Sequence, residues 1–460
     1  MKLRKTLAAI LTGAMLFGLA ACGSPSTPST APSGSGSGSG STPPATSTTP
    51  APSGGDSTEI TLWTYPVGKW ADEATVKSLT DGFTAETGIK VTVEYLAYAD
   101  GDDKVNAAIT AKQTPDLVLE GPQRLVTNWG VGGHMVDLSD MFDDTDKAEI
   151  DPYALNACIA PTGEIYEYPL VMTAHCMAVN LDAFKEAGAD QYLDLENHTW
   201  TTENFFKAVE ALNSHFGQTV GAVYCVGQGG DQGTRALVNN LYGGTFVNSD
   251  HTGYTWDDEA NIQALKALYD AAGIDYDASI AGGDEIALFY QGVLKMAFCW
   301  NIQQQLNPNQ ANTGAGLTMN GEEIAFMSFP TSDGKSQLCG GVWGFGIFDN
   351  GDQARIDASK QFIKYMCDSE KTADAVRTAS FFAVRDTAEG TDLTHIWDDE
   401  PLMAEYTKLL PMLGEYYEDV PGWAQARTSW WNMLQKIGAG EDIASTVSTY
   451  MTEANTAAAG

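Results

Sequence analysis

The sequence has few basic residues. Its 460 residues include 25 Lys and Arg against 60 Asp and Glu, which gives a formal net charge of -35. A surface that binds nucleic acid needs a basic face to neutralise phosphates, and docking on anionic lipid headgroups needs one too. We therefore expect neither nucleic acid nor an anionic membrane surface as a charge-driven partner. An acidic surface instead keeps a protein soluble.

Cysteines are also sparse, with seven in the chain and no CxxC pair among them. This excludes the usual spacing of a zinc ribbon or a thioredoxin-like site. Several cysteines have apolar neighbours, such as Cys176 before Met177 and Cys299 before Trp300. This context favours buried thiols that pack as small apolar residues. A disulfide between two of them, as secreted proteins form, stays open.

The motifs of common enzymes are absent. The chain contains no HExxH, GxSxG, GxxxxGK or GxGxxG sequence, and its six histidines form no i,i+4 pair. The glycine-rich loop at 227–233 is followed by no Lys-Ser/Thr, so it does not predict a phosphate site. We expect no metal, no cofactor and no catalysis. With 60 acidic residues, however, a carboxylate pair for glycoside hydrolysis stays open.

The N-terminus has the pattern of a secretion signal. Lys2, Arg4 and Lys5 precede an apolar run at 7–21 that is too short to cross a bilayer comfortably. The run ends in Leu-Ala-Ala before Cys22, which resembles the lipobox of bacterial lipoproteins. That resemblance implies cleavage after residue 21 and a lipid on Cys22. Ordinary A-x-A cleavage that leaves a free Cys22 is the alternative.

A segment of low complexity follows the cysteine. Residues 22–57 are almost entirely Ser, Gly, Thr, Pro and Ala, so they cannot bury enough apolar surface to fold. As a flexible coil such a segment spans roughly 30 Å. A tether of this reach, joined to a lipid, predicts a domain held at the extracytoplasmic face of the cell membrane.

The remainder alternates strands and helices. Strands are expected at 60–65, 89–96 and 116–119, with a helix between the first two that ends at Gly88. This β-α-β-α-β order predicts a parallel sheet covered by helices. A second alternating region has strands at 176–180 and 220–226 and a helix capped by Thr201. Further strands are expected at 295–300 and 341–348, and late helices at 353–367, 370–378, 425–437 and 443–458.

These units predict an α/β protein with two lobes, each a mainly parallel sheet flanked by helices, and a ligand cleft at the hinge. The expected boundaries are 58–171 plus 301–390 for the first lobe and 172–300 plus 391–460 for the second.

Several blocks, in order, resemble one known family. They read TLWTY at 61–65, FTAETGIKVTV at 83–93, PDLV at 115–118, VDL at 136–138, FYQGVLKMAFCW at 289–300, FP at 329–330 and GGVWG at 340–344; the stretch 163–181, with Tyr166, Pro169 and Asn180, lies between. Each block is weak alone, but their order from about residue 58 to the end is similar to the extracellular solute-binding proteins of ABC importers, especially the maltose-binding-like sugar binders. The resemblance implies a periplasmic-binding-protein-like fold.

Ligands of open parallel sheets bind beyond the carboxyl ends of the strands. That rule alone nominates Trp63 and Tyr65 after the first strand and Glu120 after the third, with Gln123 and Arg124 close behind. The resemblance adds six further candidates for ligand binding: Thr173, Asp231, Trp300, Trp343, Trp423 and Arg427. For each of these residues a purely structural role in the core or in an ion pair is the alternative.

The chemistry of these residues suits a sugar. An indole or phenol ring covers the apolar face of a pyranose, while carboxylates, amides and guanidinium groups bind its hydroxyls. We expect a monomeric receptor that binds carbohydrate and delivers it to the permease subunits of an ABC transporter. A peptide or a polyol phosphate as ligand, a surface glycoside hydrolase and an adhesive lipoprotein are the alternatives.

Overall fold

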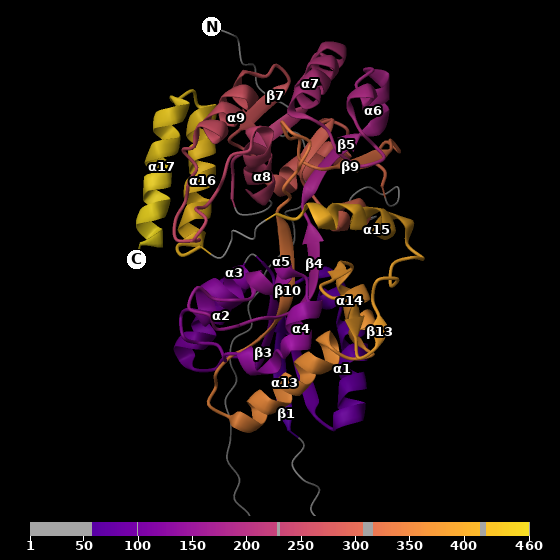
Figure 1. The fold of residues 1–460 in the computed structure, drawn as a ribbon, viewed down its shortest axis with the longest axis vertical. Helices are drawn as coiled ribbons and strands as arrows, with labels where there is room; N and C mark the ends of the chain where they lie inside the picture. The colour runs from indigo at the N-terminus through magenta and orange to yellow at the C-terminus, as the bar shows by residue number, and fades with distance from the viewer. Residues whose placement is uncertain (1–57, 99, 228–230, 307–315, 415–419, 460) are drawn as a thin grey trace, which may run out of the picture. The chain divides into compact units, whose positions relative to one another are not determined.

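The computed structural model describes residues 58–98, 100–227, 231–306, 316–414 and 420–459 (Figure 1). The expected signal peptide, Cys22 and the tether lie outside the described residues. The strands are β1 Glu59–Thr64, β2 Lys90–Tyr95, β3 Leu117–Glu120, β4 Tyr168–Ala174, β5 Cys176–Asn180, β6 Gly221–Tyr224, β7 Ile274–Asp277, β8 Met296–Trp300, β9 Ile324–Met327, β10 Gly340–Ile347, β11 Phe382–Ala383, β12 Thr387–Ala388 and β13 Thr391–Asp392.

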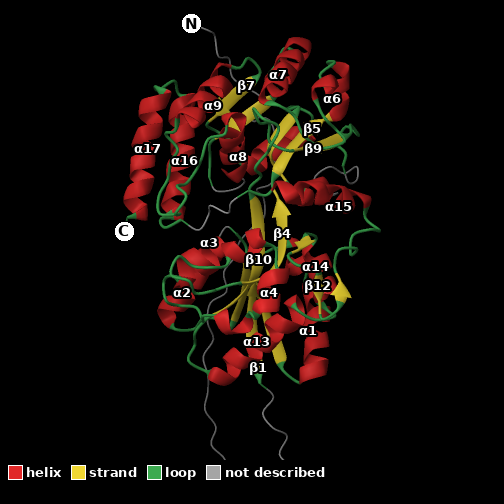
Figure 2. Ribbon diagram, viewed as in Figure 1, coloured by secondary structure: helices red, strands yellow, loops and turns green. Residues whose placement is uncertain are grey.

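Helices make up much of the rest, and Figure 2 shows them flanking the strands. They are α1 Glu73–Thr87, α2 Gly101–Ala111, α3 Pro122–Arg124, α4 Asp144–Glu149, α5 Pro152–Ala157, α6 Leu181–Glu186, α7 Thr202–Phe216, α8 Asp231–Tyr242, α9 Glu259–Asp270, α10 Gly282–Tyr290, α11 Ile302–Leu306, α13 Gln353–Cys367, α14 Thr372–Ala379, α15 Pro401–Tyr406, α16 Trp423–Gly438 and α17 Ile443–Ala458. Among these described helices, none combines the length and apolar character that a membrane span requires.

The first lobe is built on a six-stranded sheet in the order β11-β4-β10-β3-β1-β2. β1 pairs in parallel with β2 and β3, which confirms the β-α-β-α-β prediction. The side chain of Asp72 caps the start of α1 by accepting from the amide of Thr75 at 2.9 Å, and Gly88 ends the helix at φ 76°. Only a residue without a Cβ adopts that left-handed conformation at no cost.

The second lobe contains the antiparallel sheet β8-β5-β9 and the parallel pair β6-β7. The two-lobed α/β class is therefore confirmed, but the strand directions are more mixed than expected. In the first sheet, β10 is antiparallel to both β3 and β4, and β11 is antiparallel to β4. Only His175 separates β4 from β5, so the chain passes from one sheet into the other as one extended segment without a helical crossover.

The later boundary between the lobes also needs adjustment. The expected first-lobe range 301–390 includes β9, yet β9 pairs with β5 in the second lobe. The chain enters the first sheet at Gly340, the first residue of β10. We therefore propose that the second crossing lies near residue 339. Gln303 of α11 joins the lobes here, since its amide donates to the carbonyls of Ala379 at 3.1 Å and Ser380 at 3.0 Å.

The core contains the described cysteines. Cys158, Cys176, Cys225, Cys299, Cys339 and Cys367 are all buried as free thiols. This confirms that they pack as small apolar residues. Burial raises the pKa of the Cys158 thiol well above its usual value, which keeps it protonated and unreactive at neutral pH.

The buried carboxyl group of Glu285 in α10 predicts a pH dependence of stability. Its side chain is wholly buried and accepts from the amides of Phe298 at 2.6 Å and Cys299 at 3.0 Å. Burial raises its pKa to about 8, against the opposing effect of these two bonds. The folded state thus binds a proton that the unfolded state releases near pH 4.5. Stability should fall as pH rises from about 4.5 to about 8, with a slope of up to about 1.4 kcal/mol per pH unit.

In Glu285→Gln, which does not titrate, this part of the pH dependence should disappear. The measurement is urea denaturation of both proteins at several pH values across that window. Equal slopes in the two proteins would show that Glu285 does not hold a proton in the folded state.

Candidate functional site

Arg124 joins four side chains at the carboxyl edge of the first sheet. Its Nε donates to Asp102 Oδ1 at 2.6 Å and an Nη donates to Glu120 Oε1 at 2.8 Å. The guanidinium carbon lies 5.1 Å from the ring centroid of Tyr65 and 5.6 Å from that of Tyr98. Charge-assisted bonds and cation-π contacts act together here. We call these five residues the Arg124 cluster.

Local sequence explains why Glu120 and Arg124 meet. Glu120 ends β3, and Pro122 then occupies the first turn of α3, where its fixed φ suits a helix start. The extended Gly121 and the short helix α3 turn the chain back, so that the side chain of Arg124 reaches that of Glu120 at the strand end. Two of the expected positions, Tyr65 and Glu120, thus lie together with Arg124. Tyr65 itself is fully buried, and its hydroxyl donates to Asp102 at 2.6 Å.

Burial sets the protonation of this cluster. It raises the pKa of Glu120 despite the nearby Arg124 guanidinium. The hydroxyl of Tyr98 is enclosed beside Glu120 although the residue as a whole is half-exposed, so the pKa of this hydroxyl also rises well above the usual value, assisted by the charge of Glu120. For Arg124, burial acts in the opposite direction, but the carboxylates of Glu120 and Asp102 outweigh it and the pKa rises. The guanidinium is therefore permanently charged, and both phenols remain hydrogen-bond donors at neutral pH.

Trp343 of β10 lies beside the cluster. Its indole lowers the pKa of the Tyr98 hydroxyl, against the larger effect of burial, and that hydroxyl donates to Glu120 Oε2 at 3.3 Å. The indole stacks on the ring of Phe381, with centroids 4.6 Å apart and an interplanar angle of 4°. The neighbouring Gly341 leaves room for the ring, because a Cβ there would lie 2.1 Å from the indole edge. The plane of Trp343 is thus fixed from two sides.

Sequence reasoning missed Tyr98, although it is the most exposed member, with 48% of its surface accessible. It follows the end of β2 closely. The rule that nominated Tyr65 after β1, namely that ligand-binding residues follow the carboxyl ends of parallel strands, also covers Tyr98. Applying it to every strand of the sheet would have found this residue.

A second aromatic group lies in the second lobe. Trp423 opens α16 and is 5% exposed, with the Arg235 guanidinium carbon 4.7 Å from its ring centroid. Phe246 lies 6.0 Å from Trp423 and 5.2 Å from Trp256, centroid to centroid. Arg427, one turn further along α16, is half-buried. Trp423 and Arg427 therefore belong to the same helix end, next to a buried aromatic core.

Three expected residues lie within the packed interior. Thr173 of β4 is fully buried beside Gly341, and its hydroxyl has no hydrogen-bond partner. Trp300 at the end of β8 is fully buried, and its indole donates to Gln305 at 2.8 Å. Trp63 is half-buried, with the Lys104 ammonium 5.0 Å from its ring centroid. None of the three is as exposed as Tyr98.

The other two expected residues lie at helix starts. Gln123 is in α3, and its amide oxygen would be 2.8 Å from a Cβ at Gly121, a position that also faces Trp343. Asp231 begins α8, while its side chain lies outside the described residues. The structure thus brings together Tyr65, Glu120, Arg124 and Trp343, with Gln123 adjacent, and places Trp423 and Arg427 on the other lobe.

Two lobes joined by extended crossing strands, with polar and aromatic residues at the strand ends, define a receptor for small solutes. The sequence bears this out, since residues 78–405 match the model of the bacterial extracellular solute-binding proteins. The chain belongs to this family, whose members act outside the cytoplasm. The comparison with curated proteins found no match.

Solved structures share the fold at low identity. The cyclic α-maltosyl-1,6-maltose binding protein of Arthrobacter globiformis has a TM-score of 0.70 and 18% identity, over 88% of this chain and 99% of that one. The GacH receptor of Streptomyces glaucescens, solved with acarbose, has a TM-score of 0.65 and 18% identity, over 86% and 97%. The maltose-bound MalE3 of T. maritima has a TM-score of 0.65 and 14% identity, over 87% and 100%.

The position of Trp343 can be tested through Gly341. In Gly341→Ala the new methyl group would overlap the indole, so the ring must leave its stack on Phe381. We expect a loss of about 1–3 kcal/mol in the free energy of unfolding, as for other overpacked sites, and a changed near-ultraviolet circular dichroism spectrum.

Gly283→Ala is the matched control, because an added Cβ at this exposed position in the first turn of α10 meets no atom within 4 Å. It should be neutral or stabilising by up to about 1 kcal/mol. If the two variants behave alike, Gly341 does not set the position of the indole.

Proposed function

We propose that this protein is the substrate-binding component of an ABC importer and that it captures a sugar or short oligosaccharide outside the cell. The observation that carries the proposal is the flat indole of Trp343, stacked on Phe381 and next to Tyr98 of the Arg124 cluster. An aromatic plane beside a carboxylate and a guanidinium matches the two surfaces of a pyranose, its apolar C–H face and its rim of hydroxyls.

In this proposal the ligand contacts Tyr98, Trp343, Glu120, Arg124 and Gln123 on the first lobe. Closure of the lobes brings Trp423, Arg427 and Asp231 from the second lobe, as in hinge-bending receptors. Tyr65, Thr173, Trp63 and Trp300 then act behind the contact surface, where they hold the strand ends in place. The solved relatives that bind acarbose, maltose and a cyclic maltosyl-maltose support a carbohydrate ligand.

The electrostatics of the site favour an uncharged ligand. The Arg124 guanidinium is already paired with Asp102 and Glu120. A phosphate would need several converging cations or helix N-termini. Hydroxyl groups, in contrast, can donate to the carboxylates and to the phenol oxygen of Tyr98, whose own proton is donated to Glu120, without disturbing these pairs.

We also propose that the receptor is a monomer held at the membrane by a lipid on Cys22, with residues 23–57 as a tether, and that it hands its ligand to the permease subunits of its transporter. Support comes from the lipobox-like Leu-Ala-Ala before Cys22 and from the low-complexity segment after it. A tethered domain remains near the permease while it samples ligand.

Trp343→Ala tests the proposed sugar site. Removal of the aromatic plane should weaken binding of a cognate sugar at least tenfold, which corresponds to about 1.4 kcal/mol, while the protein stays folded. The measurement is isothermal titration calorimetry with whichever sugar raises the melting temperature most in a panel of mono- and oligosaccharides, since a ligand of the folded state stabilises it.

Phe206→Ala, a half-buried aromatic ring on α7 that is not among the proposed contact residues, is the control and should bind as the wild type does. Peptides and a polyol phosphate belong in the same panel, because a melting-temperature shift with one of these and none with sugars would contradict a carbohydrate ligand. Release of reducing ends from an oligosaccharide during the titration would instead indicate a hydrolase.

The anchor can be tested separately with Cys22→Ser in a bacterial host that processes lipoproteins. A serine cannot carry the thioether-linked lipid, so the protein should move from the membrane fraction to the soluble extracytoplasmic fraction. Ser24→Ala, two residues along the chain, should leave it in the membrane fraction. Immunoblots of the fractions give the readout, and an unchanged membrane association of Cys22→Ser would exclude lipid attachment at this residue.

A further inference from the structure

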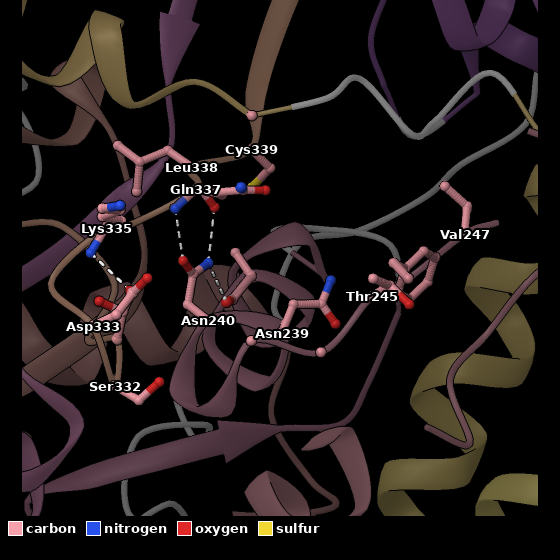
Figure 3. A pocket seen from close by; sticks show the side chains of 16 residues that line it. Asn239, Asn240, Thr245, Val247, Ser332, Asp333, Lys335, Gln337, Leu338 and Cys339 are labelled. Carbon is pink, nitrogen blue, oxygen red and sulfur yellow. Dashed lines mark hydrogen bonds between the residues drawn. The ribbon is translucent and has the colours of Figure 1, made fainter. Parts of the chain in front are cut away.

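A cavity of about 320 Å³ lies in the second lobe beside the end of α8 (Figure 3). Its walls come from residues between 236 and 247, from the segment 331–339 and from Gly414. This volume is within the range of small-molecule sites. None of the residues that we assign to the sugar site is among those that line it, so it is a separate feature.

Asn240 fixes one wall of the cavity. This side chain is 6% exposed, and its amide nitrogen donates to the carbonyls of Ala236 and Gln337, each at 2.8 Å. Its oxygen accepts from the backbone amide of Gln337, also at 2.8 Å. The dashed lines in Figure 3 show these bonds. They join α8 to the segment that leads into β10, so the wall is formed before any ligand binds.

The walls retain unused hydrogen-bonding capacity. Thr331 is 4% exposed, and its hydroxyl has no hydrogen-bond partner; the same holds for the side-chain oxygen of Asn239. Unpaired buried polar atoms are unfavourable, so a partner for them stabilises the protein. Both atoms belong to residues that line the cavity. Ser332 and Gln337 add an exposed hydroxyl and an exposed amide to the lining.

The charge pattern points to an uncharged ligand. Asp333 and Lys335, of opposite sign, are the charged residues that line the cavity. The end of α8 that meets the cavity is its C-terminus, where helix carbonyls repel anions and attract hydrogen-bond donors. An anion such as phosphate is therefore disfavoured, whereas hydroxyl groups are suited both to this helix end and to the unpaired side-chain atoms.

We propose that this cavity is a second binding site, for a small, uncharged, hydroxyl-rich molecule such as a single sugar ring or a linear polyol. Two residues that line the cavity connect it to the sugar site, and this connection rests on the proposed function. Phe246 lines the cavity and also contacts Trp423. Cys339 lines it too and directly precedes β10, which carries Trp343.

The test uses saturation-transfer NMR titrations of the full-chain protein with D-glucose and with sorbitol. Trp343→Ala serves as the background, because it should weaken binding at the sugar site at least tenfold. Within this background Ser332→Trp places a large ring at the exposed mouth of the cavity, and Ser332→Ala is its matched control. Thr331→Val removes the unpaired hydroxyl while keeping the shape of the side chain, so it should fold normally.

We expect at least one probe to bind the Trp343→Ala background. Its affinity should be unchanged when Ser332→Ala is added, at least tenfold weaker when Ser332→Trp is added, and several-fold weaker when Thr331→Val is added. Binding that resists Ser332→Trp would place the probe elsewhere and overturn the proposal.

The outcome also separates this proposal from the proposed function. If both probes bind the wild type but not the Trp343→Ala background, the cavity is not a site and the sugar site stands. If Trp343→Ala loses the cognate sugar while the background still binds a probe through Ser332, both stand. Binding of a probe at the cavity with no sugar response in the wider panel would support the cavity and overturn the sugar receptor.

Discussion

The guanidinium of Arg124 is the group on which the edge of the first sheet depends. Asp102 and Glu120 lie on different elements and both bind this guanidinium. Without it, the two carboxylates would repel each other. A buried carboxylate such as Glu120 is costly to charge, and truncation of one partner in a buried pair leaves the other uncompensated. The two phenol rings of Tyr65 and Tyr98 complete its surroundings. This one cation therefore holds α2, α3 and the loop after β2 against the strand ends.

Much of the first lobe follows from local sequence signals. The strands β1, β2 and β3 and the helix end at Gly88 occur where alternation and capping predict them, because each signal acts within a few residues. The late helices α13 and α17 also match their predicted ranges. In contrast, β4 is buried along its whole length and has no alternating pattern. Its role as the bridge between two sheets depends on tertiary pairing that a local pattern does not encode.

The same distinction applies to the site. Glu120 and Arg124 could be placed together because they are close in sequence at the carboxyl end of one strand. Phe381 could not be placed against Trp343 from sequence, since the stack joins β10 to the segment after α14. Likewise, Arg235 and Trp423 are brought together by the packing of α8 and α16. Long-range contacts of this kind depend on the whole core, so residue type and spacing alone identify candidates but not their partners.

The passage from β4 to β5 through His175 has a consequence for motion. One residue between two sheets provides no extra length of chain. Any reorientation of the lobes must therefore occur through a few backbone torsions near that residue. The amide of His175 donates to the carbonyl of Cys339 at 2.8 Å, which ties this passage to the one that precedes β10. Two of the connections are thus held side by side, so a change in the orientation of the lobes must turn both of them together.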